Sequence, residues 1–309
     1  MDEVGRIAML ARVLRAGGQG IEVGIGDDAA VLSPPGTRLV WTIDEQVEGV
    51  HFRRDLASWH DVGWRSYMAA ASDVAAMGAT PWCALAALVV PVDVDDAALE
   101  AIATGQREAA EVAGAPVVGG NLARGPAMSI ATTVLGTCKR PVERRGAVAG
   151  DGLWMAGRVG LAAAGLRALE EGKGTEPRLA AAIAAWRVPR ALFEEGWAMG
   201  ATAHAAVDVS DGLARDAGHL AEASGVQVVF DEAALLDDAV LLEAAGALGE
   251  SALELALHGG EDYALVAASR QPIEGFRRIG EVRAGRGLVL RSVAGERRLE
   301  PRGFDHFAR

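Results

Sequence analysis

The chain has 309 residues, half of them hydrophobic, and carries a formal net charge of −12 at pH 7. This length is enough for about two domains of ordinary size. The acidic balance and the absence of a long basic run argue against a nucleic-acid-binding protein.

Helix and strand patterns alternate through the first half of the chain. Apolar spacing predicts a helix in DEVGRIAMLARVL, a strand over residues 38–43, and a helix in DVGWRSYMAAASDVAAMG that ends before Pro81. CALAALVVP predicts a buried strand, and residues 93–114 predict a helix with an acidic first turn, as the helix dipole favours. APVVGG and MSIATTVLG predict two further strands.

A polar, basic stretch from Thr137 to Gly152 predicts a domain boundary, so we expect domains at residues 1–140 and 141–309. The second half then predicts a strand at LWMAG, helices over residues 161–200, a strand at AAVDVS, a helix at DGLARDAGHLAEASG, and strands at VQVVFD and YALVAAS. No simple βαβ repeat dominates. We therefore expect an α/β (α+β) protein with mixed sheets flanked by helices.

The cysteines and the hydropathy of the sequence predict the cellular compartment of the protein. Cys83 and Cys138 do not form a CxxC pair, which argues against a disulfide framework and a thiolate metal site. The N-terminal stretch MDEVGRIAML lacks the layout of a signal peptide, and the longest apolar runs are too short to span a bilayer. We expect a soluble, cytoplasmic protein with no membrane partner.

Acidic residues gather in short clusters on apolar frames. The clusters are GIGDDAAVL with Asp27 and Asp28, TIDEQVEGVHF with Asp44 and Glu45, ASDVAAMGA with Asp73, VDVSDG with Asp208 and Asp211, and HGGEDYALV with Glu261 and Asp262. Any one of them alone is most simply a helix cap or a turn. Together they favour a site for a hard cation such as Mg²⁺ or Mn²⁺, which prefers oxygen ligands.

Besides the acidic clusters, the sequence contains a glycine-rich turn that could bind phosphate. In VVGGNLARG a Gly pair precedes Asn121 and Arg124, and backbone amides in such a turn can bind phosphate oxygens. The same stretch is also compatible with an ordinary strand-to-loop turn. The sequence contains no GxxxxGK[ST] and no GxSxG, and His219 and His258 lie on helical patterns, where a surface or packed imidazole is the simpler interpretation.

Seven motifs occur in an order that resembles a known family. They are GIGDDAAVL, DEQVEGVHF, SDVAAMGATP, GGNLARGP, DVSDGLARDAGH, GGEDYALV and the terminal GFDHF, and they span nearly the whole chain. The sequence resembles the thiamine-monophosphate kinase family, within the superfamily of aminoimidazole ribonucleotide synthetase (the PurM-like fold).

The resemblance implies an ATP-dependent transfer of a phosphoryl group to thiamine monophosphate, giving thiamine diphosphate. It also implies several Mg²⁺ ions and a homodimer in which the N-terminal domains pair. By motif, Asp44, Asp211 and Arg145 are implied to carry catalysis. The implied metal ligands are Asp28, Thr42, Asp44, Asp73, Asn121, Asp208 and Asp211; the nucleotide contacts are Gly120, Asn121, Arg145 and Ser210; the thiamine-phosphate contacts are His51, Glu261 and Phe304.

Two other hypotheses stay open. The first is a different activity on the same scaffold; selenophosphate synthetase would show a reactive N-terminal Cys and the hydrogenase-maturation relative a terminal Cys, and this chain has neither. The second is a protein that binds ATP or thiamine phosphate without turnover. It is suggested by Asn121 in GGNLARG, where the family pattern is GGDTT, because an amide supplies one formal charge fewer to a cation.

Overall fold

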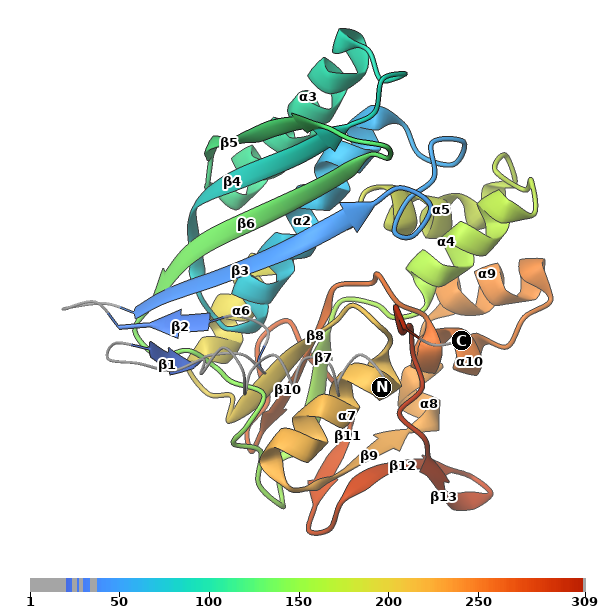
Figure 1. Ribbon diagram of the computed structural model, residues 1–309. Coiled ribbons are helices and arrows are strands. Elements are labelled where there is room, and N and C mark those ends of the chain that lie inside the picture. The colour runs from blue at the N-terminus through green and yellow to red at the C-terminus, as the bar shows by residue number, and fades with distance from the viewer. Residues whose placement is uncertain (1–20, 24–26, 28–29, 34–37, 308–309) are drawn as a thin grey trace.

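The computed structural model describes residues 21–23, 27, 30–33 and 38–307. They form two mixed sheets, one in each half of the chain (Figure 1). In the first sheet only β4 and β5 pair in parallel, and in the second only β9 and β12 do. The α/β class with mixed sheets is therefore confirmed. None of the helices in this described part is long and apolar enough to cross a membrane.

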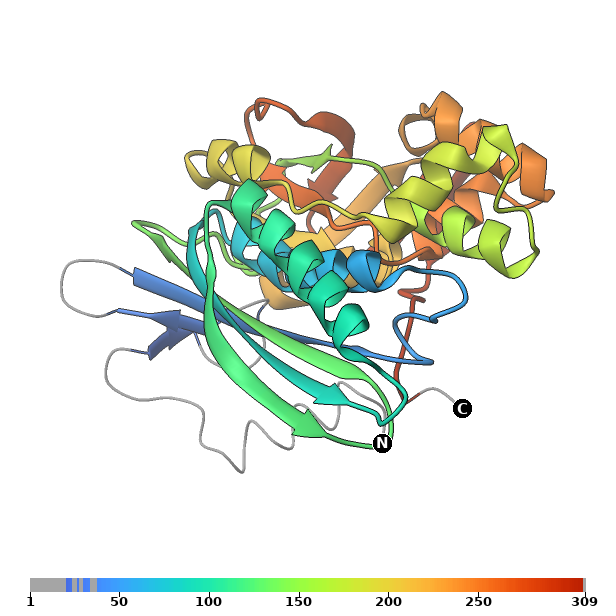
Figure 2. The same cartoon turned by 90° about the horizontal axis from the view of Figure 1, so that it is seen from above.

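The first sheet is built from the N-terminal half and is six-stranded. Its strands, in spatial order, are β1 (Ile21–Val23), β2 (Ala30–Leu32), β3 (Arg38–Val47), β6 (Ser129–Cys138), β4 (Thr80–Val90) and β5 (Val117–Arg124). Helices α2 (Trp59–Ala76) and α3 (Asp96–Ala113) lie on one face of this sheet (Figure 2). Among the described elements, none covers the opposite face (Figure 2).

The second sheet is seven-stranded and comes from the C-terminal half. Its strands, in spatial order, are β13 (Gly295–Leu299), β12 (Gly287–Ser292), β9 (Gln227–Asp231), β11 (Arg277–Arg283), β7 (Gly152–Ala156), β10 (Ala264–Ser269) and β8 (Ala205–Val209). The helices of this half are α4 (Leu161–Glu170), the 3₁₀ turn η1 (Pro177–Leu179), α5 (Ala180–Arg187), α6 (Phe193–Gly200), α7 (Leu213–Ser224), α8 (Glu232–Leu235), α9 (Ala239–Leu248) and α10 (Ala252–His258).

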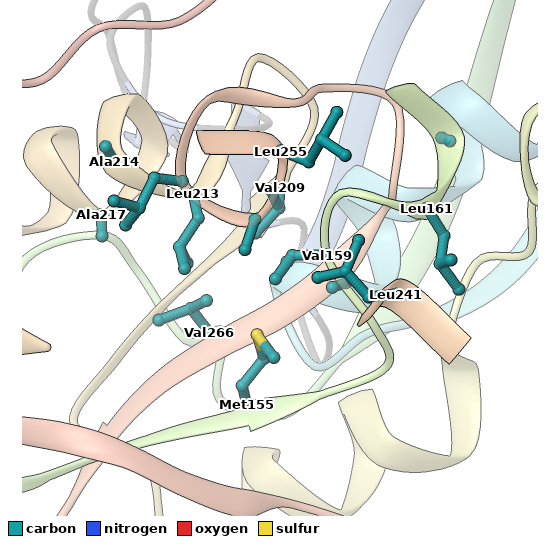
Figure 3. Packing of buried hydrophobic residues seen from close by; sticks show 14 of the residues in the cluster. Met155, Val159, Leu161, Val209, Leu213, Ala214, Ala217, Leu241, Leu255 and Val266 are labelled. Atoms are coloured by element: carbon teal, nitrogen blue, oxygen red, sulfur yellow. The ribbon is translucent and has the colours of Figure 1, made fainter. Parts of the chain in front are cut away.

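The largest core cluster joins the second sheet to the helices beside it. Met155 and Val266 project from the sheet toward Leu213, Leu241 and Leu255 on the helices (Figure 3). The same cluster continues into the first half of the chain through buried residues of α3 and β6. Because one apolar core crosses the junction, the strand ends and loops of both halves are held in fixed relation there.

Most predicted elements are confirmed, and the differences concern the N-terminal helix and several elements after residue 231. The predicted helix over residues 2–14 lies outside the described residues. The pattern analysis missed β11, β12 and β13, whose exposed positions carry arginines such as Arg297 and Arg298, and it missed helices α8 to α10. In these segments the apolar alternation is short or interrupted, so local periodicity carries little signal.

Helices α2 and α3 pack so closely that their backbones are in contact. Gly63 and Gly105 permit this close packing because they have no side chain. A Cβ added at Gly105 would lie 2.1 Å from the carbonyl oxygen of His60, and one at Gly63 would lie 2.0 Å from that of Ile102. We expect Gly105→Ala to lower the free energy of unfolding by roughly 1–3 kcal/mol, because the helices must move apart.

Gly246, in α9, is the matched control. A Cβ there would meet nothing within 4 Å, so Gly246→Ala should be neutral or slightly stabilising through helix propensity. Denaturant unfolding of both variants checks the prediction. Equal stability of the two would mean that the helix crossing tolerates a methyl group.

Candidate active site

A cavity of about 630 Å³ lies where the two halves of the chain meet. Its volume falls in the range of small-molecule sites. Its walls come from β3, α2, the loop after β8, the loop before β10, α4 and the C-terminal segment. Eight of the predicted site residues line it: Asp44, His51, Asp73, Asp208, Ser210, Asp211, Glu261 and Phe304.

Strand alternation places two predicted ligands on the helix-facing side of the first sheet. Thr42 and Asp44 are two residues apart on β3, so both side chains leave the same face. The Thr42 hydroxyl donates a hydrogen bond to Asp73 on α2, which faces this side of the strand. One turn of helix and one strand therefore bring three oxygen-bearing side chains together.

A contact between the halves adds the carboxylate of Asp208. This residue is the last but one of β8 and is 3% exposed. The hydroxyl of Ser72, next to Asp73 on α2, donates to Asp208 Oδ2 at 2.6 Å. Asp73 and Asp208 thus belong to one connected group, although they are far apart in the chain.

The carboxylates repel one another electrostatically. The pKa of Asp44 is raised, first by burial and then by the charges of Glu261 and Asp211. A buried carboxylate with like-charged neighbours is costly unless a cation compensates it. The donor set therefore fits a hard divalent cation. Among the described residues, however, no group of three or more His, Cys, Asp or Glu side chains is arranged to hold a metal ion.

Asp216, the third aspartate of VDVSDGLARD, has a role that sequence reasoning missed. Its Oδ2 accepts hydrogen bonds from the backbone N–H groups of Ser210, Asp211 and Gly212, at 3.0, 3.0 and 3.1 Å. Gly212 precedes α7 with φ of +124°, a conformation that favours glycine, and it offers no capping side chain. Asp216 therefore fixes the loop that carries Asp211. The sequence does contain a signal for this role: an aspartate in the first turn of a helix whose N-cap residue is a glycine, which has no side chain to cap the helix.

Aromatic rings line another part of the cavity. The His306 ring lies 4.9 Å from that of His51 and 4.7 Å from that of Phe304, centroid to centroid. The backbone N–H of Phe304 donates to the carbonyl of Asp211 at 3.0 Å, which ties the C-terminal segment to the acidic loop. Burial lowers the pKa of His51 to about 4, so this imidazole is neutral at pH 7. The motif pattern did not single out His306.

The GGEDY loop holds Glu261 against the acidic loop. Glu261 has φ of +63°, and its backbone N–H donates to the carbonyl of Ser210 at 2.7 Å. The next residue, Asp262, turns away and accepts from the N–H groups of Gly160 and Ala162 at 2.6 and 3.0 Å, at the start of α4. Burial raises the pKa of Asp262 to about 7. Glu261 is thus directed to the cavity, and Asp262 anchors the loop.

Four predicted site residues do not line this cavity. Gly120 and Asn121 lie on β5, the exposed edge strand of the first sheet. Arg145 is largely exposed and pairs with Glu143 at 2.5 Å. Thr42 does not line the cavity, but its hydroxyl donates to Asp73, which does. Asp28, the remaining predicted ligand, lies outside the described residues.

Comparisons with known proteins agree with the fold and with the motif order. The family model described as AIR synthase related protein, N-terminal domain, matches residues 26–138. A thiamine-monophosphate kinase of Mycobacterium tuberculosis (strain CDC 1551 / Oshkosh) is 36% identical over 99% of this chain and 93% of that protein. One of Aquifex aeolicus (strain VF5) is 34% identical over 92% of each.

A solved structure, AaThiL complexed with AMPPCP and TMP, superimposes with a TM-score of 0.91 at 33% identity. The match covers 99% of this chain and 97% of that one. Identity above 30% over nearly the full length of both chains, together with this superposition, identifies relatives and not merely a shared fold. The chain belongs to the thiamine-monophosphate kinase family, with the PurM-like two-sheet fold.

Proposed function

We propose that this chain phosphorylates thiamine monophosphate with ATP by direct in-line transfer. The bond between the γ-phosphorus and the oxygen bridging to ADP breaks, and a bond forms to an oxygen of the thiamine phosphate. One observation carries the proposal. Four carboxylates, Asp44, Asp73, Asp208 and Asp211, line one cavity, which is also lined by Glu261, His51, Phe304 and His306. The family relatives named as thiamine-monophosphate kinases support it.

The four carboxylates, with Asp28 by motif, are the residues that would hold Mg²⁺. Magnesium is usually bound by one or two carboxylates with waters and substrate phosphates, which is compatible with aspartates that do not form a closed protein cage. When bound, the ions would reduce the repulsion between the two phosphate-bearing substrates and stabilise charge on the transferring group.

The protein's own side chains position and orient the two substrates. The accepting oxygen of thiamine phosphate is already ionised at neutral pH, so the reaction needs no strong general base. Neutral His51 and the ring of Phe304 offer packing surfaces for the substrate rings, and an aromatic face attracts the cationic thiazolium. Asp216 holds the backbone of Ser210, which we assign to nucleotide, and of Asp211, which we assign to metal. Catalysis by positioning and electrostatics fits this arrangement.

We also propose two domains, residues 1–140 and 141–309, and a homodimer formed through the first sheet. The side of that sheet away from its helices carries exposed apolar side chains, including Trp41 (47% exposed), Ile43 (65%) and Leu85 (42%). An apolar face of this kind on a sheet is typical of a protein interface. A second copy seated on it would bury β5 as well. Gly120 and Asn121, which lie on β5, stay predicted nucleotide contacts on the motif alone.

We expect Ile43→Glu to shift the protein from dimer to monomer, because it places a charge in the proposed interface. Val293→Glu is the control, since Val293 is fully exposed between β12 and β13. Light scattering after size-exclusion chromatography measures the mass. A wild-type monomer, or an Ile43→Glu variant that stays dimeric, would contradict this interface.

The test of the activity is direct. Purified protein is incubated with ATP, Mg²⁺ and thiamine monophosphate, and thiamine diphosphate is followed by chromatography with each substrate omitted in turn. We expect product only in the complete mixture. ATP binding without ADP or thiamine diphosphate at any Mg²⁺ concentration would favour a diverged binding protein, the hypothesis that Asn121 suggests. The cytoplasmic location stays a prediction.

A further inference from the structure

One buried arginine contacts three segments around the cavity without lining it. Arg65, on α2, is 1% exposed. Its guanidinium donates to the carboxylate of Glu261, to the carbonyl of Trp186 on α5, and to the carbonyl of His51 at 3.3 Å. Two of these three partners, Glu261 and His51, are among the three predicted contacts to thiamine phosphate.

Trp186 completes the arrangement around Glu261. Its indole N–H donates to Glu261 Oε2 at 2.8 Å, while Arg65 donates to Oε1. The guanidinium carbon of Arg65 lies 4.7 Å from the centroid of the Trp186 ring. Both oxygens of the carboxylate therefore have a fixed donor, and the ring restricts the arginine that supplies one of them.

This network differs from an ordinary surface ion pair. Arg65 and Trp186 are almost fully buried, whereas the side chain of Glu261 is 25% exposed and lines the cavity. A buried charge needs a well-oriented partner, and charge-assisted hydrogen bonds to a carboxylate set its direction as well as its energy. Arg65 and Trp186 thus hold the carboxylate of Glu261 from the protein interior, and Glu261 is the member of the network that faces the cavity.

We infer that Arg65 and Trp186 are positioning residues for the thiamine-phosphate end of the site. They hold the carboxylate of Glu261, and Arg65 also holds the backbone at His51, in the orientation that the substrate meets. The inference rests on the proposed function, in which Glu261 and His51 contact thiamine phosphate. Because Glu261 and Trp186 belong to the second half of the chain and Arg65 to the first, the network also sets the two walls of the cavity relative to each other.

Trp186→Phe is the sharpest test, because it keeps a buried aromatic ring and removes the indole N–H that donates to Glu261 Oε2, while the Arg65 contact to Oε1 stays. We expect the KM for thiamine monophosphate to rise about tenfold, as for loss of one hydrogen bond to a charged group, with kcat within about twofold and the KM for ATP unchanged. Trp154→Phe is the matched control: it also removes an indole N–H bond, to the Ser269 carbonyl at 3.0 Å, away from the cavity. It should leave both KM values unchanged.

Arg65→Lys and a double variant extend the test. Lys keeps the charge but not the fork of donors, so we expect a raised KM for thiamine monophosphate in a protein that still folds. Adding Trp186→Phe to Glu261→Gln should raise that KM little beyond Glu261→Gln alone, because both changes act through one carboxylate.

Calorimetric binding of thiamine monophosphate to wild type and variants separates the two proposals. If wild type binds without turning over, the kinase proposal fails, and the positioning inference is still read from the weaker binding of Trp186→Phe. A Trp186→Phe variant with lowered melting temperature but unchanged affinity for thiamine monophosphate overturns the inference, as does an equal rise in both KM values.

Discussion

Asp211→Asn is expected to lower kcat by about 100- to 1,000-fold while the protein stays folded. Asp211 supplies a partly exposed carboxylate to the cavity, and its charge already raises the pKa of Asp44. The substitution keeps the size of the side chain and removes one negative charge from the group that would hold Mg²⁺. The Mg²⁺ concentration needed for half-maximal rate should rise as well, because a neutral amide is a weaker ligand for a hard cation.

Asp55→Asn is the control for this variant. Each of the two aspartates pairs with an arginine: Asp55 with Arg53 at 2.6 Å and Asp211 with Arg215 at 3.4 Å. Asp211 lines the cavity, whereas Asp55 lies on the surface away from it. Loss of a surface pair of this kind costs little. Steady-state rates over a Mg²⁺ titration, with circular dichroism to confirm folding, give the answer. An Asp211→Asn enzyme with wild-type rate and Mg²⁺ dependence would remove Asp211 from the proposed ligand set.

Asp216→Ala is expected to destabilise the protein by several kcal/mol, on the order of 3, since unpaired buried polar groups cost about 1–3 kcal/mol each. Three backbone N–H groups, on Ser210, Asp211 and Gly212, lose their acceptor together. Turnover should also fall in the fraction that stays folded, because Asp211 is no longer held. Asp216→Asn should be milder, since its amide oxygen can still accept.

Glu222→Ala is the comparison on the same helix, because Glu222 is exposed on α7. It should leave stability within about 0.5 kcal/mol of wild type. Denaturant unfolding and turnover at a temperature where all variants are folded measure the two effects. A stable Asp216→Ala protein with normal turnover would show that the loop keeps its conformation without this carboxylate.

Local pattern was sufficient for much of the site. Apolar spacing predicted the helix that carries Asp73 and a strand over residues 38–43, which the structure extends through Asp44 to Val47. The order of motifs across the chain led to the family before any contact was known. These inferences succeed because periodicity and motif spacing depend on neighbours in sequence, where backbone geometry is fixed.

Other features needed the folded chain. Arg65 and Trp186 are ordinary residues of amphipathic helices in the sequence, and only packing brings them to Glu261, 196 and 75 residues further along. Gly120 and Asn121 were predicted as nucleotide contacts, yet the strand order puts them at an exposed edge, because β5 pairs on one side only among the described strands. Strand order depends on long-range pairing, which no local pattern encodes.

Family membership and most helices and strands were thus readable from residue order alone. Only the tertiary structure showed which carboxylates line one cavity, which residues orient them, and which motifs lie away from that cavity. The physical reason is that a carboxylate's role depends on its partners. Asp208 meets Ser72 and Asp216 meets three amides through packing, whereas the sequence shows only aspartates after strands and in helices.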